Sequence, residues 1–577
     1  MNKDLSVSSG GTTNSSTQKP EDFYDMDQVN QENQADEGNQ VEEGNQVDEG
    51  NKVNDKEINV DHDNDHGDDD HDDDDDYIHL IPSPTVDEIS KVREILFLLT
   101  LAYTQLITQA VLSQSIVPSN VIARDLNVLG QPGEISWFSA SFSLTVGTFI
   151  LIGGRLGDVL GYKKVYLCSY AWLSIWSMIT GLTVYTGSNI FYDVSRSMQG
   201  LALSISMPNA LGIIGHYYPI GGRKNMAMGL FAAVAPGGFV IGAIFSAIFG
   251  QFATWPWMYY TTAIASVFVL LISYLIIPKN IGSRPKVINY KSFDILGSIT
   301  GVSALILFNF SWNQGPVVGW DTPYVYVLLI VSILMLIAFY FIERRVENPL
   351  IPNGLSKDTW ITLVIIAAGW SSFGIWLFYG FLYGYEILGL NMIVSAIQFI
   401  PTLFAGLIAG LTTGAIIHKV PVQAVLLVSM VAFLVGSILN GLRPKHSIYW
   451  AMKFPSMCIT SFGMDTSFPA GIVMLSDMLP KRSQGLAASL MSTCVNYSIS
   501  IGLGFAGTVE YYIVRRTNHP DKTWMGIRSA QYTGIGLAGL GLVICLLYII
   551  QHVVYRKKDV PKESNKLNES GEDESNV

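Results

Sequence analysis

Residues 154–164 have the sequence Gly154-Arg-Leu-Gly-Asp158-Val-Leu-Gly161-Tyr-Lys163-Lys164 and lie between two long apolar stretches. A short connection between helices needs glycine where backbones approach closely or where φ is positive. The lysine pair suits the cytosolic side of a membrane, and Asp158 suits the N-terminus of a neighbouring helix, whose dipole stabilises a carboxylate. A generic charged turn explains the lysines but not this spacing. The segment therefore predicts a specific hairpin between two membrane-spanning helices.

Apolar stretches of about twenty residues, the length that crosses a bilayer, recur beyond Lys91. Charged residues make up 14% of the chain and hydrophobic residues 49%, which argues against an ordinary soluble protein. Every backbone polar group must be satisfied internally in lipid, so only helices and closed barrels span it. Runs such as 325–341 and 262–277 lack the two-residue alternation of a barrel strand. The sequence therefore predicts an all-α polytopic membrane protein.

The hydropathy pattern predicts about fourteen spans, each long enough to cross a hydrocarbon core of roughly 30 Å. They lie near residues 95–116, 135–153, 165–186, 190–215, 226–250, 257–277, 294–312, 324–342, 360–385, 393–417, 423–441, 449–475, 484–509 and 531–554.

The positions of Lys and Arg predict the orientation of these spans. If the N-terminus is cytosolic, most of these residues beyond residue 90 fall in cytosolic loops, for example Lys163, Lys164, Arg344 and Arg345. The outer loops before residues 449 and 531 are exceptions. An even number of spans places both termini in the cytosol, and twelve spans would do so as well.

Residues 1–90 form a polar N-terminal segment without the basic start and short apolar core of a signal peptide. Their low apolar content predicts a disordered acidic cytosolic tail. Within it, His62, His66 and His71 are interleaved with the Asp run of residues 61–76. Two interpretations remain: a metal-chelating segment, since carboxylate and imidazole both bind divalent ions, or a solvated, self-repelling tail.

The fourth span contains Asp193-Val-Ser-Arg196-Ser-Met-Gln199-Gly200. An arginine inside an apolar helix is expensive and usually faces a cavity or a partner. In the alternative interpretation, Arg196 reaches the outer surface with Asp193 as a local partner.

The fifth span contains Gly229-Leu-Phe-Ala-Ala-Val-Ala-Pro236-Gly237-Gly238-Phe-Val-Ile-Gly242. Proline removes a helix hydrogen bond and kinks the helix, and glycines allow close packing on a neighbour. A plain structural kink is the simpler interpretation of this run.

These three runs resemble motifs of the major facilitator superfamily: the loop signature, the Arg-x-x-Gln-Gly motif associated with proton coupling, and the antiporter motif of exporters. Tyr162 replaces the usual arginine of the loop signature, which removes one ionic contact from that hinge. Phe293-Asp294-Ile-Leu-Gly297 and Pro480-Lys-Arg-Ser-Gln-Gly485-Leu-Ala-Ala-Ser489 resemble the fourteen-span drug/proton antiporter branch. Within that branch, residues 90–555 are most similar to fungal aminotriazole-resistance proteins and their boron-exporting and ammonium-transporting relatives.

The resemblance implies the major facilitator fold, with two six-helix bundles facing each other and two inserted helices. We expect an N-terminal bundle over 91–280, the insertion over 281–345, a C-terminal bundle over 346–555 and a cytosolic tail over 556–577. The hinge loop then comprises Gly154, Asp158, Gly161, Lys163 and Lys164, and the antiporter motif Pro236, Gly237, Gly238 and Gly242. Arg196 and Gln199 are implied in proton coupling.

The first span departs from the branch, because it carries Gln105, Gln109 and Gln114 where bacterial members have an acidic residue. Proton coupling must then use another carboxylate or be absent. By elimination, Asp465 in the twelfth span is the acid deepest in a span, and removal from water would keep it neutral for part of a transport cycle. Alternatively, Asp465 is a capping or packing carboxylate held by Thr466 and Ser467.

We expect Arg196 and Asp465 both to face a central cavity. We expect Gln109, Gln114, Trp370 and Glu386 to line it. Glu386 alternatively lies at the interface with the headgroups, and Lys453 is expected to extend its ammonium group to the outer surface. No nucleotide-binding loop, zinc-site spacing or hydrolase motif is present, so we expect no enzyme activity, cofactor or metal.

The function we expect is export of small molecules from the cytosol in exchange for protons. The alternative is a facilitator or channel-like transporter of a small polar solute such as ammonium or boric acid. A third hypothesis, a transporter-like nutrient sensor, rests on the long tail alone. The expected partners are the substrate, protons and the lipid bilayer, not nucleic acid, and we expect a monomer at the plasma membrane in preference to the vacuole.

Overall fold

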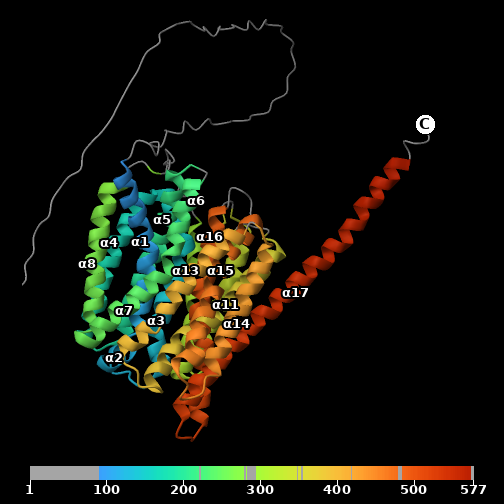
Figure 1. Cartoon of the computed structure of the whole chain (residues 1–577). Coiled ribbons are helices and arrows are strands. Elements are labelled where there is room, and N and C mark those ends of the chain that lie inside the picture. The colour runs from blue at the N-terminus through green and yellow to red at the C-terminus, as the bar shows by residue number, and fades with distance from the viewer. Residues whose placement is uncertain are drawn as a thin grey trace, which may run out of the picture. The chain divides into compact units, whose positions relative to one another are not determined.

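The computed structural model describes residues 90–219, 222–278, 281, 294–346, 349–351, 355–417, 419–478 and 484–572. The predictions for residues 1–89 lie outside this part of the chain, as do Phe293 and most of the basic segment after Pro480. All regular elements of the described residues are helices (Figure 1). They are α1 (Lys91–Ile116), α2 (Ser119–Asp125), α3 (Pro132–Leu160), α4 (Tyr162–Leu182), η2 (Thr183–Tyr185), α5 (Asn189–Tyr217), α6 (Gly222–Ala233), α7 (Ala235–Phe252), α8 (Pro256–Ile276), α9 (Ile295–Val318), α10 (Pro323–Glu343), α11 (Lys357–Glu386), α12 (Met392–Ile397), α13 (Ile400–Ile416), α14 (Val422–Gly441), η4 (Tyr449–Lys453), α15 (Phe454–Met478), α16 (Gln484–Arg516) and α17 (Lys522–Glu572).

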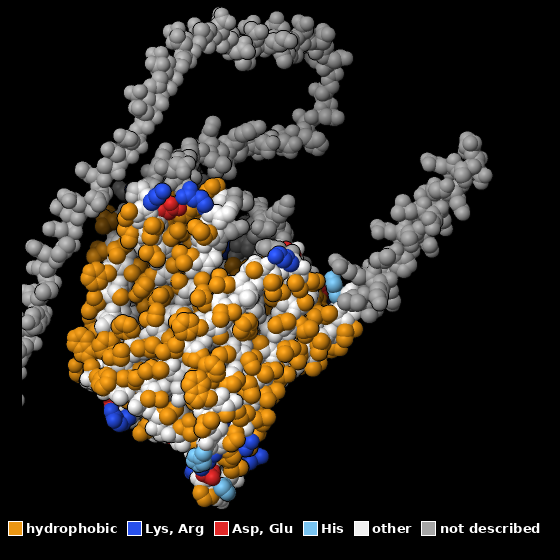
Figure 2. All heavy atoms as spheres, in the orientation of Figure 1, with side chains coloured by type: hydrophobic (Ala, Val, Ile, Leu, Met, Phe, Trp, Pro, Cys, Tyr) orange, Lys and Arg blue, Asp and Glu red, His pale blue; other side chains and the backbone are white. Residues whose placement is uncertain are grey.

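Each expected span coincides with one of these helices or with a consecutive pair. Among the described residues, 12 helical segments are long and apolar enough to cross a membrane. The two expected spans outside that set are α5 and α16, which have 29 and 33 residues and are more polar. Figure 2 shows a face of the body covered by hydrophobic side chains, with Lys and Arg gathered at its ends. This distribution fits a body surrounded by lipid.

Burial separates central helices from peripheral ones. In its most apolar stretch α3 is 83% buried, whereas the corresponding stretch of α10 is only 11% buried. Exposed side chains of α10 include Ile330, Leu334 and Phe341. An apolar helix with so little contact to protein is best accommodated against lipid.

Three expected spans are interrupted. The span at 226–250 is divided at Val234 into α6 and α7, and the span at 393–417 is divided into α12 and α13. Pro236 and Pro401 lie in the first turn of the second piece in each case, where the missing N–H ends the preceding helix. The span at 449–475 begins with a π-helical turn, η4. At the C-terminus, α17 continues to Glu572, beyond the expected start of a tail at residue 556.

The helices pack into two groups joined by a few long contacts. In the first, α3 and α4 pack on α5, α7 packs on α1, and α8 packs on α4; in the second, α15 packs on α13 and α14, and α11 packs on α16 and α17. Contacts of α3 with α16, and of α7 with α12 and α13, connect the two groups. The helices α9 and α10 pack on each other, and α9 also packs against α3 and α16. The domain boundaries set out above remain a prediction.

Glycines permit the closest of these contacts. A Cβ on Gly147 of α3 would lie 2.6 Å from the backbone nitrogen of Tyr497 in α16. A Cβ on Gly242 would lie 2.5 Å from Ser113 Oγ and 2.6 Å from the carbonyl oxygen of Ala110, both in α1. Side chains are therefore excluded from both interfaces, which is how membrane helices approach each other closely.

Gly242→Ala should destabilise the protein, because its methyl group must displace the backbone of α1. Overpacking of this kind costs about 1–3 kcal/mol. The midpoint of thermal unfolding in detergent should fall. Gly229→Ala is the matched control within the same motif, since no described atom outside its own helix backbone lies within 4 Å of a Cβ at Gly229. Equal midpoints for the two variants would contradict the assignment of Gly242 to a backbone contact.

Candidate functional site

The hairpin at residues 154–164 is formed by the end of α3 and the start of α4. Gly161 alone separates the two helices, which extend further into this segment than expected, and its φ of 94° favours a glycine at this position. Tyr162 donates a hydrogen bond from its hydroxyl to Asp158 Oδ1. The residue that replaces the usual arginine thus makes a neutral contact with the motif carboxylate. Asp158 itself is exposed.

The basic pair of the hairpin has two different environments. Lys163 donates to the carbonyl oxygen of Tyr274 at 2.8 Å and to that of Ile277, at the C-terminal end of α8. This is the favourable place for a cation relative to a helix dipole. Lys164 is exposed. Gly154 lies against α5 and α16, where its Cβ would meet Pro208 at 3.6 Å and Ser489 at 3.8 Å.

Arg196 is fully buried on α5, so the interpretation in which it reaches the surface is wrong. Its guanidinium donates to the carbonyl oxygens of Val111 (2.8 Å) and Phe138 (3.3 Å), and to Ser115 Oγ (3.1 Å). A fourth bond goes to Gln199 Oε1 at 2.6 Å. These acceptors belong to α1, α3 and α5, and all are neutral.

The hydrogen-bond network around Arg196 extends to a fourth helix, because Gln199 donates to Ser177 Oγ of α4 at 2.8 Å. The guanidinium also lies over the ring of Phe142, at 4.8 Å from its centroid. A planar group with five donors can hold several acceptors at once, which an ammonium cannot. Arg196 therefore ties three helices of the first group together.

The glutamines of α1 have unequal roles. Gln114 donates to Thr262 Oγ1 of α8 at 2.8 Å, and its Oε1 has no hydrogen-bond partner among the described residues. Gln105 is buried, and its Oε1 also lacks a described partner. Gln109 is half-buried. Acceptors that the surrounding helices leave unpaired are candidates for a ligand donor.

The antiporter motif presents two faces of α7. Gly238 and Gly242 lie against the backbone of α1: a Cβ at Gly238 would come 2.9 Å from Leu106 Cα. Gly237 lies on another side, where its Cβ would lie 3.5 Å from Leu403 of α13. The motif is thus more than a kink, because it joins α7 to α1 and turns its start towards the second group of helices.

Asp465 lies at this same contact. A Cβ on Gly406 of α13 would be 2.6 Å from Asp465 Oδ2 and 3.0 Å from Pro236 Cγ. Oδ2 is shielded from solvent and has no hydrogen-bond partner in the described part of the chain. The hydroxyls of Thr466 and Ser467 bond instead to backbone carbonyls of their own helix. The interpretation that these two residues hold Asp465 is therefore wrong.

Trp370 and Glu386, two residues expected to line the cavity, have different environments in α11. Trp370 is half-buried and donates from Nε1 to Ser467 Oγ of α15 at 3.1 Å, two residues from Asp465. Glu386, at the end of α11, is exposed and accepts a 3.2 Å bond from Asn120. Of these two residues, Trp370 is the one that contacts α15, the helix that carries Asp465.

Glu510 is a buried acid that the sequence argument overlooked. It is 3% exposed within α16 and accepts a 2.7 Å hydrogen bond from the hydroxyl of Tyr379 in α11. The predicted span ended at residue 509, one residue too early, and placed Glu510 outside. The apolar residues that follow it, up to Val514, were the signal that the helix continues. The second group of helices therefore contains, besides the half-buried Asp465, a more deeply buried acid.

The contact between α7 and the α12–α13 segment differs along its length. At one end, a Cβ on Gly250 would lie 2.9 Å from Met392 Sδ, and Gln251 accepts from the backbone of Ile393 at 3.4 Å. Tyr385 donates to the carbonyl oxygen of Val117 at the same end. At the other end, Cβ atoms on Gly229, Gly410 and Gly414 would have no described neighbour within 4 Å. The contact between α7 and the α12–α13 segment is therefore close at the end that carries residues 117–131.

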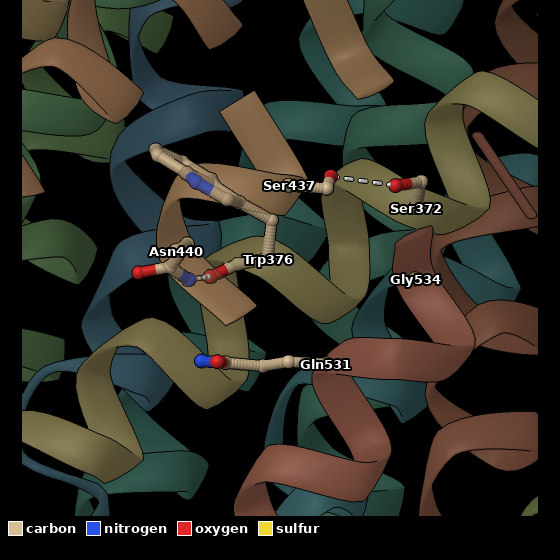
Figure 3. Close-up of a pocket in the computed structure, with 6 residues that line it drawn as sticks. All are labelled: Ser372, Trp376, Ser437, Asn440, Gln531 and Gly534. Carbon is tan, nitrogen blue, oxygen red and sulfur yellow. Dashed lines mark hydrogen bonds between the residues drawn. The ribbon is translucent and has the colours of Figure 1, made fainter. Parts of the chain in front are cut away.

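A small pocket lies within the second group, between α11, α14 and α17. Figure 3 shows its lining, in which Ser372 and Ser437 bond at 2.9 Å and Asn440 donates to the carbonyl oxygen of Trp376 at 3.4 Å. The described residues contain no group of three or more His, Cys, Asp or Glu that could hold a metal ion.

Comparison with known proteins agrees with this architecture. The model of the Major Facilitator Superfamily matches residues 99–503 and 403–573. The low affinity ammonium transporter of Saccharomyces cerevisiae is 45% identical over 473 residues, covering 81% of this chain and 91% of that protein. The aminotriazole resistance protein of the same yeast is 40% identical over 469 residues, covering 80% and 85%. The efflux pump terJ of Aspergillus terreus is 35% identical over 467 residues, covering 80% and 89%.

Among solved structures, a POT family transporter in complex with a thioalcohol conjugated peptide superposes with a TM-score of 0.57 at 15% identity. The match covers 80% of this chain and 95% of that one. At this identity the likeness shows the fold alone, and it confirms the predicted major facilitator fold. The chain is therefore a member of the major facilitator superfamily of membrane transporters, with resistance proteins and efflux pumps among its relatives.

Proposed function

We propose that this transporter exports a small molecule from the cytosol in exchange for protons, and that Asp465 carries the proton. The observation that carries the proposal is the meeting of Asp465 with Pro236 of the antiporter motif over Gly406. A proton site at the contact between the two helix groups can respond to their relative movement. Relatives that are an efflux pump and a resistance protein support export as the direction.

The physical argument starts from the surroundings of the Asp465 carboxylate. Oδ2 has no described hydrogen-bond donor, and both Oδ2 and carbon atoms of Pro236 lie close to the same side of Gly406. A carboxylate without donors is unfavourable away from water, whereas its protonated form is tolerated. Closure of α7 on α13 therefore favours the protonated acid, and separation that admits water favours proton release. This difference couples proton binding to the alternation between two conformations.

Arg196 has a less direct role in this proposal. Its four hydrogen bonds all go to neutral groups of α1, α3 and α5. We propose that it keeps these helices together as a unit while the two groups move. Gln109 and Trp370 are our candidates for contact with the substrate. Orientation with both termini in the cytosol, a monomeric state and location in the plasma membrane belong to the same proposal.

A facilitator of a small polar solute is the second candidate. Two observations favour it: the 45% identity with a low affinity ammonium transporter, and the glutamines of α1, whose membrane-spanning residues 95–116 include no acid. Such a transporter needs no titrating group. Dependence on a pH gradient therefore separates the two functions.

Purified protein in liposomes with an acidic lumen tests this directly, with radiolabelled aminotriazole and methylammonium as probes. Antiport predicts protein-dependent accumulation in the lumen that is lost when an ionophore collapses the pH gradient. Protein-free liposomes correct for trapping of weak bases. A protein-dependent initial rate that is the same with and without the gradient would favour the facilitator.

Asp465→Asn should abolish gradient-driven accumulation, because the amide keeps the shape of the side chain and cannot bind or release the proton. Exchange of labelled for unlabelled probe without a gradient should persist, which shows that the variant is folded and binds its substrate. Glu386→Gln is the control, since that acid is exposed at the end of α11. If Asp465→Asn accumulates the probe normally, Glu510 becomes the candidate and Glu510→Gln the next variant.

Arg196→Lys should lower both stability and transport, because an ammonium cannot reach acceptors on three helices at once. Each charge-assisted hydrogen bond lost costs about 1.5–3 kcal/mol. The midpoint of thermal unfolding in detergent and the initial rate of flux measure the two effects. Arg124→Lys is the matched control, since Arg124 is exposed and paired only with its neighbour Asp125. An unchanged midpoint for Arg196→Lys would contradict the structural role given to Arg196.

A further inference from the structure

A second group of unpaired polar atoms lies in the C-terminal half, away from Asp465. Lys453, the last residue of the π-helical turn η4, is 3% exposed, so the expected extension of its ammonium group to the surface is wrong. Its Nζ has no hydrogen-bond partner among the described residues and forms no described ion pair. An ammonium group buried in this way is costly unless something compensates its charge.

The surroundings of Lys453 are aromatic and donor-rich. Nζ lies 5.5 Å from the ring centroid of Trp376 and 5.0 Å from that of Phe399. Gly380 leaves room beside it: a Cβ there would be 2.8 Å from Lys453 Nζ and 3.5 Å from Asn440 Nδ2. Two ring contacts restore only part of the solvation that an ammonium loses on burial.

Nearby charges increase this deficit. Arg443 is 4% exposed, stacks on the ring of Tyr383 at 3.8 Å and repels Lys453 electrostatically. Nε and Nη2 of Arg443 have no described hydrogen-bond acceptor, and neither has Nε2 of Gln531 in α17. An Asn440 amide turned by 180° would give Lys453 one neutral acceptor, which leaves the charge uncompensated. The region therefore has two buried basic side chains and a surplus of donors.

The pocket of Figure 3 adjoins this group, because Trp376 and Asn440 belong to both. Its other lining residues are small or neutral: Ser372, Ser437, Gln531 and Gly534. The pocket is too small to hold a ligand in this conformation, and its hydroxyl, amide and aromatic groups would become available beside Lys453 when the helices separate.

We propose that Lys453 is the anchor of an anion-binding site, and that its ligand is a solute with one carboxylate on a small apolar body. The carboxylate compensates the ammonium and accepts from the surplus donors, while Trp376 and Phe399 contact the apolar part. Lys453 is almost completely buried in this conformation, so the ligand enters when the helices around it separate. The binding site itself does not depend on the proposed function. A role of this ligand as the transported substrate rests on that function.

Benzoate and benzamide test the site, because they share a shape and differ in charge. Binding of radiolabelled benzoate to the purified full-length protein in detergent should be saturable. Unlabelled benzoate should displace it, and benzamide should not. Lys453→Met, which keeps the length of the side chain and removes the charge, should raise the Kd for benzoate at least tenfold. Lys445→Met is the control, since Lys445 lies outside this group and pairs with Asp521 at 2.5 Å.

Stability without ligand gives an independent readout. Lys453→Met should raise the midpoint of thermal unfolding, because replacing an uncompensated buried charge by an apolar side chain removes a cost. A lysine with a structural partner would instead make the variant less stable. The proposal is overturned if wild-type protein shows no saturable benzoate binding, if benzamide competes equally, or if Lys453→Met retains the wild-type Kd.

The same assay separates this inference from the proposed function. Asp465→Asn should bind benzoate with an unchanged Kd even when its gradient-driven flux is lost. Normal flux in Asp465→Asn together with Lys453-dependent binding would overturn proton coupling at Asp465 and leave the anion site standing. Loss of benzoate binding in Asp465→Asn, with folding intact, would overturn the separation of the two sites.

Discussion

The backbone contact between α7 and α1 determines how the rest of this transporter is arranged. Gly238 and Gly242 are four residues apart and so lie on the same side of α7, against the backbone of α1. Because that side is committed to α1, the start of α7 at Pro236 and Gly237 is turned towards α13. A side chain at Gly242 would push α7 away from α1 and change which residues meet Asp465. The proposed proton site therefore depends on the absence of two side chains.

Charged side chains inside the helical body differ in whether they have hydrogen-bond partners, and this difference distinguishes their roles. Arg196 has hydrogen bonds to acceptors on three helices, which suits a group that holds them together. Glu510 has a hydrogen bond from Tyr379. Asp465 Oδ2 and Lys453 Nζ have no described partner. Satisfied polar groups stabilise a fold, and unsatisfied ones are where a ligand or proton gains most by binding.

Hydropathy and motif spacing were enough to predict the helices, a hairpin at residues 154–164 and the fold family, but not that Gly161 alone separates the two helices. The break beside Pro236 was anticipated as a kink, whereas the break before Pro401 was missed, although a proline within an apolar stretch is the same signal. Glu510 was missed because a glutamate next to two tyrosines resembles the end of a span. Lys453 was placed at the surface on the basis of its distance from the helix start, although rings of Trp376 and Phe399 from other helices cover it.

Sequence by itself determined the class of structure, because the requirement that lipid imposes on the backbone is local: each apolar stretch must form its own hydrogen bonds and hence a helix. It also determined where glycine allows close approach, since the absence of a side chain is a property of one residue. Only the tertiary structure decided which charges are compensated. Partners of Arg196, Asp465 and Lys453 lie on helices far away in sequence, and their contacts depend on how those helices pack. The meeting of Asp465 with Pro236, and the absence of a described partner for Lys453, could not be read from either segment alone.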